Sequence, residues 1–108
     1  MKKSVMTKWV KALRSGKYNQ GGGYLKKDNY YCCLGILCAF SPHKKNFTKM
    51  KNVGKIANFS LPVKIMKWSG LKTDTGVFSD NICLTSMNDE GKDFNHIADF
   101  IEKNWRKL

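Results

Sequence analysis

The sequence predicts a small single domain of the α+β class, in which about four helices pack with one or two short antiparallel β-hairpins. The chain has 108 residues, a length that suits one compact domain. Some stretches repeat apolar residues at helical spacing, whereas others place short strand-like runs on either side of turn residues. With 42% hydrophobic and 12% aromatic residues, the chain has enough apolar side chains for a folded core.

The first predicted element is an amphipathic helix over residues 4–15. Ser4 is its expected N-cap, and Gly16 follows its last turn. A single apolar stripe is expected along this helix, made of Val5, Met6, Trp9, Val10 and Leu13.

A short hairpin is expected next. Gly21, Gly22 and Gly23 exclude a helix between residues 17 and 29. Strand-like residues at 24–26 and 30–31 flank a turn over residues 27–29.

Residues 30–40 form the longest apolar run of the chain and predict its central buried element, a helix near 31–40. Eleven residues are too few to cross a bilayer, which needs about 20 as a helix. Gly35 would let another stretch of backbone approach this helix closely. Residues 43–60 are polar and basic, and predict an irregular loop with one short strand or turn.

The C-terminal part predicts two more helices. The first covers 61–69, with Ser60 as its cap and Pro62 in its first turn. Residues 75–79 and 82–87 predict the two strands of a hairpin with Asp80-Asn81 as its turn. A helical turn over 84–88 is the alternative to the second strand. A turn is expected over 88–91. The last helix covers 93–106 with Asp93 as its N-cap.

Taken together, these elements predict which side chains form the core. The expected set comprises Trp9, Leu13, Leu34, Leu37, Ile65, Trp68, Leu84, Phe94, Ile97 and Ile101.

Positive charge is concentrated in the first two thirds of the chain. The net charge is +12, but residues 1–73 carry +15 and residues 74–108 carry −3. Such a field attracts polyanions, although a lysine-rich surface can also serve solubility alone. No apolar segment follows the basic N-terminus, so no targeting or membrane segment is predicted and a cytoplasmic location is expected.

The residues that usually carry chemistry form no recognisable arrangement. Of the four cysteines, Cys32, Cys33 and Cys38 lie in the apolar run, where thiols normally pack as small hydrophobic groups. The spacing of these cysteines does not match a zinc site, so neither a metal nor a cofactor is predicted. His96 is expected to face solvent, and the acids near residue 90 to cap a helix. A non-enzymatic protein without catalytic residues is therefore expected.

A candidate ligand site lies in residues 14–27. Cations, aromatic rings and an amide are interleaved there, and such a mixture can pair with phosphates while a ring stacks on a base. The three glycines are more simply a flexible turn than a phosphate loop, because no P-loop lysine follows them. The candidate ligand-binding residues are Arg14, Lys17, Tyr18, Gln20, Tyr24, Lys26 and Lys27.

Two blocks of the sequence resemble a family of small bacteriophage proteins. Residues 9–20 match its W-x-x-A-L-R-S-G-x-Y-x-Q block, and residues 31–38 match its F/Y-C-C-L-G-x-L-C block. Residues 61–71 and 84–102 are also similar, whereas the heavy lysine content and His96 depart from the family pattern. The family provides no established activity. The resemblance implies an accessory protein that acts by binding in the host cytoplasm.

Three functions therefore remain open. The leading hypothesis is a host-takeover or anti-defence protein that binds a phosphate-rich ligand, such as a nucleotide immune signal. The alternatives are a DNA- or RNA-binding protein, whose affinity would fall steeply with salt, and an inhibitor that docks on an acidic surface of a host protein. No membrane partner is expected, and the sequence does not determine an oligomeric state.

Overall fold

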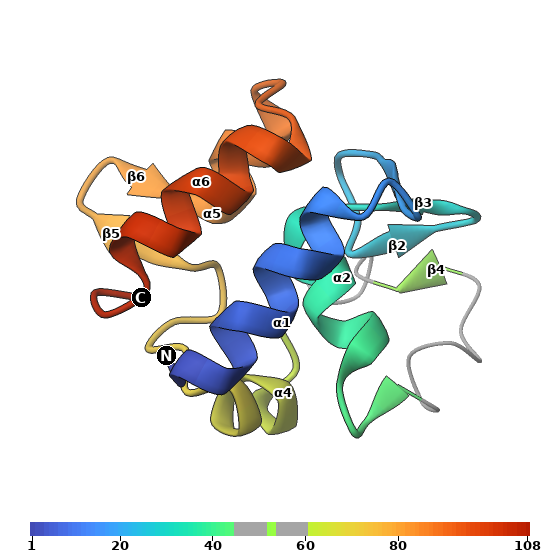
Figure 1. Cartoon of the computed structure of the whole chain (residues 1–108). Coiled ribbons are helices and arrows are strands. Elements are labelled where there is room, and N and C mark those ends of the chain that lie inside the picture. Colours follow the sequence, from blue (N-terminus) through green and yellow to red (C-terminus); the bar gives the residue numbers. More distant parts are fainter. Residues whose placement is uncertain (45–51, 54–60) are drawn as a thin grey trace.

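The computed structural model describes residues 1–44, 52–53 and 61–108, and confirms a small α+β domain (Figure 1). Its helices are α1 (Lys3–Arg14), α2 (Cys33–Phe40), α4 (Val63–Ser69), α5 (Leu84–Asp89) and α6 (Phe94–Asn104). Its strands are β1 (Asn19–Gln20), β2 (Lys26–Lys27), β3 (Tyr30–Tyr31), β4 (Asn52–Val53), β5 (Val77–Ser79) and β6 (Ile82–Cys83).

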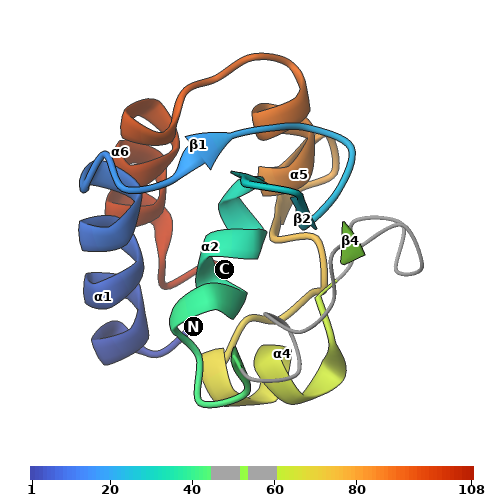
Figure 2. The same cartoon turned by 90° about the vertical axis from the view of Figure 1, so that its right-hand side faces the viewer.

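Helices α1 and α6 lie side by side and cover one face of the domain (Figures 1 and 2). The predicted stripe of α1 is confirmed, because Val5, Met6, Trp9, Val10 and Leu13 are all buried. Helix α6 buries Phe94, Ile97, Ala98 and Ile101 in the same way. The apolar spacing of both helices is thus explained by their packing on a shared core.

Helix α2 is the centre of the core. Every residue from Cys33 to Cys38 is buried, so this helix is covered on all sides rather than along one stripe. The indole Nε1 of Trp9 donates a hydrogen bond to the carbonyl of Cys33 at 2.9 Å, which fixes α1 against the start of α2. Gly35 contacts the backbone of Leu25, as the sequence predicted: a Cβ there would lie 1.8 Å from the Leu25 carbonyl oxygen.

The first hairpin is confirmed with a tighter turn than expected. Strand β2 pairs antiparallel with β3, with Lys26 opposite Tyr31 and Lys27 opposite Tyr30, so the connection is only Asp28 and Asn29. Strand β1 adds to β3 in parallel and β4 adds to β2, which gives the order β1-β3-β2-β4. These two outer pairings were not predicted.

The second hairpin and its helical alternative are both present. Strands β5 and β6 pair across Asp80-Asn81, and α5 begins directly afterwards at Leu84. The predicted turn over residues 88–91 is partly wrong, because Asn88 and Asp89 still belong to α5.

Helix starts are the commonest errors of the sequence analysis. Ser4 lies inside α1, which begins after Lys2 without a side-chain cap. Pro62 is the N-cap residue of α4 rather than a first-turn residue, and Ser60 lies outside the described residues. Asp93 is confirmed as the N-cap of α6, since its Oδ1 accepts the His96 N–H at 2.8 Å.

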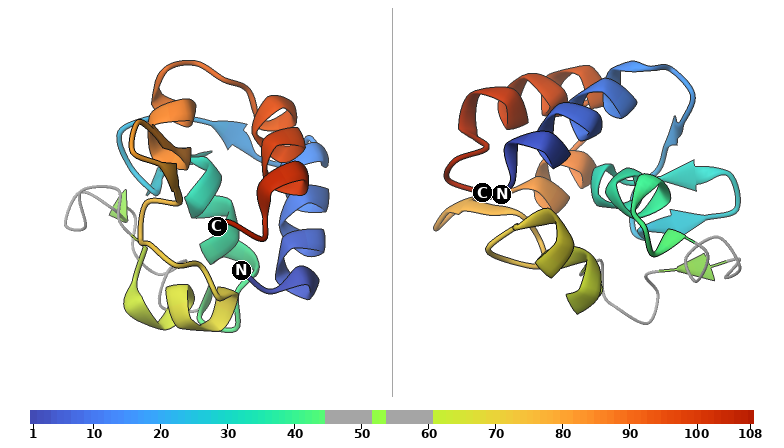
Figure 3. Two further views of the ribbon diagram at one scale, coloured as in Figure 1. Left: turned by 90° about the vertical axis from the view of Figure 1, so that its left-hand side faces the viewer. Right: turned by 60° about the horizontal axis from the view of Figure 1, so that its bottom comes forward.

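The predicted core is confirmed for nine of its ten members, and Trp68 is the exception. Its ring is only partly buried and packs edge-to-face on Phe40, with 5.7 Å between ring centroids. The chain ends meet on the same side of the domain (Figure 3), where the Met1 amino group donates to the Trp105 carbonyl at 3.3 Å.

Candidate functional site

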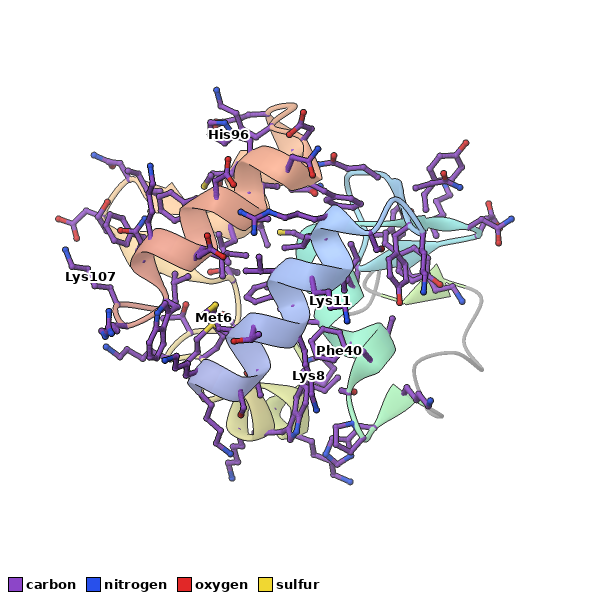
Figure 4. The ribbon with its side chains drawn as sticks, in the orientation of Figure 1. Met6, Lys8, Lys11, Phe40, His96 and Lys107 are labelled. Carbon is purple, nitrogen blue, oxygen red and sulfur yellow. The ribbon has the colours of Figure 1, made fainter. Side chains whose placement is uncertain are left out.

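A groove runs along the face of α1 that points away from α6. Its α1 wall is built from Lys8, Lys11, Ala12 and Ser15, which share a face because they are spaced three and four residues apart. The opposite wall is Phe40 at the end of α2, and Figure 4 shows Phe40 close to the two lysines. Lys17 and Tyr18 complete this lysine groove, which has a volume of about 280 Å³.

The turn after α1 holds Lys17 and Tyr18 in place. The Ser15 hydroxyl donates to the Ala12 carbonyl at 2.6 Å and accepts the Lys17 backbone N–H at 3.2 Å. The Tyr18 ring is half-buried and packs edge-to-face on Tyr31, with 5.1 Å between ring centroids. Tyr18 is therefore a fixed aromatic wall beside the exposed lysine side chains.

The charge of the lysine groove is all of one sign. Three lysines line it, and none of the described residues in its lining is acidic. Ammonium groups bind phosphate oxygens, and an aromatic face stacks on a nucleobase. The groove can therefore hold an anion next to a flat ring.

A second groove, also of about 280 Å³, shares Tyr18 with the lysine groove and is called here the polar groove. Leu13, Arg14, Gly16, Tyr18, Gln20, Asp93, Phe94 and Asn95 line it. Among the described residues of its lining the one cation is Arg14, and it is already bound. The Arg14 guanidinium donates to Asp99 at 2.5 Å and to Glu102 at 3.2 Å. These hydrogen bonds raise the pKa of Arg14 above its ordinary value. The charge of Arg14 is thus largely offset by two residues of α6.

Gln20 is anchored by its side-chain amide. Its Nε2 donates to Asn88 Oδ1 at 3.0 Å and to the Lys92 carbonyl at 2.7 Å. Asn88 in turn donates to the Gly21 carbonyl at 2.9 Å and accepts the Cys33 N–H at 3.2 Å. The side chain of Gln20 therefore connects β1 to the segment between α5 and α6.

The remaining candidates lie on the first hairpin and line neither groove. The ammonium of Lys27 is 5.0 Å from the centroid of the Tyr24 ring, and that of Lys26 is 5.8 Å from the centroid of the Tyr31 ring. Because Tyr31 also contacts Tyr18, Lys26 is connected to the wall of the lysine groove through two rings. The structure thus divides the seven candidates among two grooves and a hairpin.

Sequence reasoning missed Lys8 and Lys11. It singled out Arg14 and the cations at 17, 26 and 27 instead. The helical spacing of the sequence does indicate this groove. Lys8, Lys11 and Ser15 share a face with Ala12, and the small side chain of Ala12 leaves a depression between the longer ones.

A family model described as a domain of unknown function (DUF8296) matches residues 1–105. The chain belongs to this family. The DUF8296 match includes every residue that lines the lysine groove and the polar groove. No curated protein and no solved structure matches the chain. The description of DUF8296 names no activity.

Neither a metal cluster nor a membrane span is found in the described part of this DUF8296 protein. Over residues 1–44, 52–53 and 61–108, no three histidine, cysteine or acidic side chains gather closely enough to hold a metal ion. Among the same residues, no helix is both long and apolar enough to span a bilayer.

The thiols of this DUF8296 protein are expected to differ sharply in reactivity. Burial raises the pKa of Cys32 from 9.0 to about 11 and also raises the pKa values of Cys33 and Cys38. Partial burial opposes ionisation of Cys83, but hydrogen bonds with the Ser86 and Thr85 hydroxyls outweigh it and lower the pKa of Cys83.

At about pH 8, a thiol reagent should therefore label Cys83 first in the folded protein, since the thiolate is the reacting form. Peptide mass spectrometry would locate the label, and comparable labelling of Cys32 or Cys38 would contradict the burial of those two thiols.

The free energy of unfolding should also fall as the pH rises from 9.0 towards 11. The reason is that the Cys32 thiol loses its proton at a lower pH in the unfolded chain than in the folded protein.

Proposed function

We propose that this protein is a non-enzymatic accessory protein of a bacteriophage, acting in host takeover or anti-defence by binding a phosphate-rich ligand such as a nucleotide immune signal. The observation that supports the binding role is the lysine groove, in which Lys8, Lys11 and Lys17 surround a space walled by Tyr18. The phage context rests on the two sequence blocks at residues 9–20 and 31–38.

The shape of the groove favours a small ligand. Its volume of about 280 Å³ is close to the lower end of the roughly 300–1,000 Å³ of ligand pockets. Three cations within one such space suit a diphosphate, because each phosphate oxygen can find an ammonium donor. The Tyr18 ring offers a stacking surface for the rest of the ligand.

The neighbouring acids argue against a long nucleic acid as the ligand. Beyond α1, a phosphodiester chain leaving the groove towards α6 would meet Asp99 and Glu102, and Asp93 lines the adjoining polar groove. Carboxylates repel phosphates, so the basic surface is limited on this side.

A second candidate function, DNA or RNA binding, is still favoured by the +15 charge of residues 1–73, part of which lies outside the described residues.

The double substitution Lys8→Gln/Lys11→Gln should weaken binding of inorganic pyrophosphate about tenfold. Each exposed ion pair contributes up to about 1 kcal/mol, and about 1.4 kcal/mol corresponds to tenfold. Isothermal titration calorimetry of the full chain would measure the two affinities.

The matched control is Lys64→Gln/Lys67→Gln, which removes the same charge from two exposed lysines at the same helical spacing on α4. This control should change the affinity less than about twofold, since neither lysine lines the lysine groove. Equal losses in both variants would mean that pyrophosphate responds only to net charge, and would reject the groove. Affinity that grows with the length of a single-stranded oligonucleotide would favour the nucleic-acid alternative instead.

A further inference from the structure

The two grooves that meet at Tyr18 are opposite in character. The lysine groove presents three ammonium groups, whereas the polar groove presents the Asp93 carboxylate and an arginine that two acids already hold. A phosphate is therefore attracted to the first groove and repelled from the second. A ligand that spans Tyr18 has only one favourable orientation, with its phosphates among the lysines.

The hydrogen bonds around Gln20 fix which atom it offers to a ligand. The N–H of Cys33 is buried and donates to Asn88, so the atom of Asn88 that faces it is the acceptor Oδ1. Gln20 contacts this same oxygen and the Lys92 carbonyl, both acceptors, so the atom of Gln20 that faces them is Nε2. Its remaining polar atom is the acceptor Oε1, which makes no hydrogen bond within the described residues.

Asp93 supplies a second acceptor next to Gln20. The Gln20 amide is bonded to the carbonyl of Lys92, the residue directly before Asp93. One oxygen of the Asp93 carboxylate caps α6 by accepting the His96 N–H, and the other makes no hydrogen bond among the described residues. Two fixed acceptors therefore line the polar groove beside the Tyr18 ring.

We propose that the polar groove is the base subsite of a guanine nucleotide whose phosphates occupy the lysine groove. Guanine presents two adjacent donors, N1–H and the N2 amino group, and these match the acceptors of Gln20 and Asp93. Adenine and cytosine pair one donor with one acceptor on the same edge, and would leave an acceptor of the groove unsatisfied. This inference rests on the proposed function and names the ligand class of the same site.

Three probes test the inference with the unaltered full chain: GDP, IDP and inorganic pyrophosphate. IDP is GDP without the N2 amino group. Calorimetry should show GDP binding about tenfold more tightly than IDP, because one hydrogen bond to a charged group contributes about 1.5–3 kcal/mol. IDP should in turn bind more tightly than pyrophosphate, which has no base to occupy the polar groove.

The matched variant is Asp93→Asn, which removes the carboxylate but retains an N-cap, since asparagine caps as well as aspartate. It should lower the affinity for GDP to that for IDP and leave pyrophosphate binding unchanged.

The outcomes separate this inference from the proposed function. If GDP, IDP and pyrophosphate bind equally well, the base subsite is rejected while anion binding stands. If none of the three binds, both are rejected. An equal effect of Asp93→Asn on GDP and pyrophosphate would also overturn the base subsite, because the carboxylate would then act only through long-range charge.

Discussion

The substitution Gly35→Ala should lower the free energy of unfolding by about 3 kcal/mol, the upper part of the range for overpacked cores. In an isolated helix the same change would stabilise by about 1 kcal/mol, so the expected sign is reversed. The reason is the Leu25 carbonyl, whose oxygen would lie 1.8 Å from the new Cβ. This carbonyl cannot simply move away, because it accepts the Cys32 N–H at 3.1 Å.

Urea unfolding followed by tryptophan fluorescence would measure this loss, with Gly16→Ala as the control. Gly16 has a φ of +75°, and a Cβ added there would meet no atom within 4 Å among the described residues. Alanine at this position therefore costs only the left-handed backbone strain of about 1 kcal/mol. A loss for Gly35→Ala no greater than that of the control would show that α2 and Leu25 are not in close contact.

The substitution Asn88→Ala should lower the free energy of unfolding by about 2–3 kcal/mol. The side chain of Asn88 makes three hydrogen bonds, to Gln20, Gly21 and Cys33, and is only 5% exposed. Alanine would leave the buried N–H of Cys33 without its acceptor, and an unsatisfied buried group costs about 1–3 kcal/mol.

The control for Asn88→Ala is Asn95→Ala, at an exposed position of α6. Substitutions at such sites usually change stability by less than about 0.5 kcal/mol. Urea midpoints measured side by side would compare the two variants, and similar midpoints would contradict the bridging role of Asn88. If Asn88 acts as described, its loss should also weaken protection of the Gly21 and Cys33 region from hydrogen exchange.

The parts of the fold that were predicted are those determined by the spacing of residues within a single element. The stripe from Val5 to Leu13 and the spacing in α6 identified both helices and their buried faces. Gly35 was identified as a close-approach site because a glycine within an apolar helix has few other uses. The parallel pairing of β1 with β3 was missed, since two-residue strands carry almost no periodic signal.

The candidate site was predicted in part for a related reason. Composition identified the segment from Arg14 to Lys27 as rich in cations and rings. It did not reveal that Asp99 and Glu102, more than eighty residues away, neutralise Arg14, or that Asn88 holds Gln20. Such pairings depend on tertiary structure, and a single sequence does not contain them.

The pairing of α1 with α6 also bears on how the protein is made. Helix α1 leaves the ribosome before α6, the helix that covers it, which is synthesised roughly eighty residues later. Until then the Trp9 stripe has no partner on that side and is open to chaperones. Docking of the two helices therefore has to wait until α6 has left the ribosome, although α1 is complete much earlier.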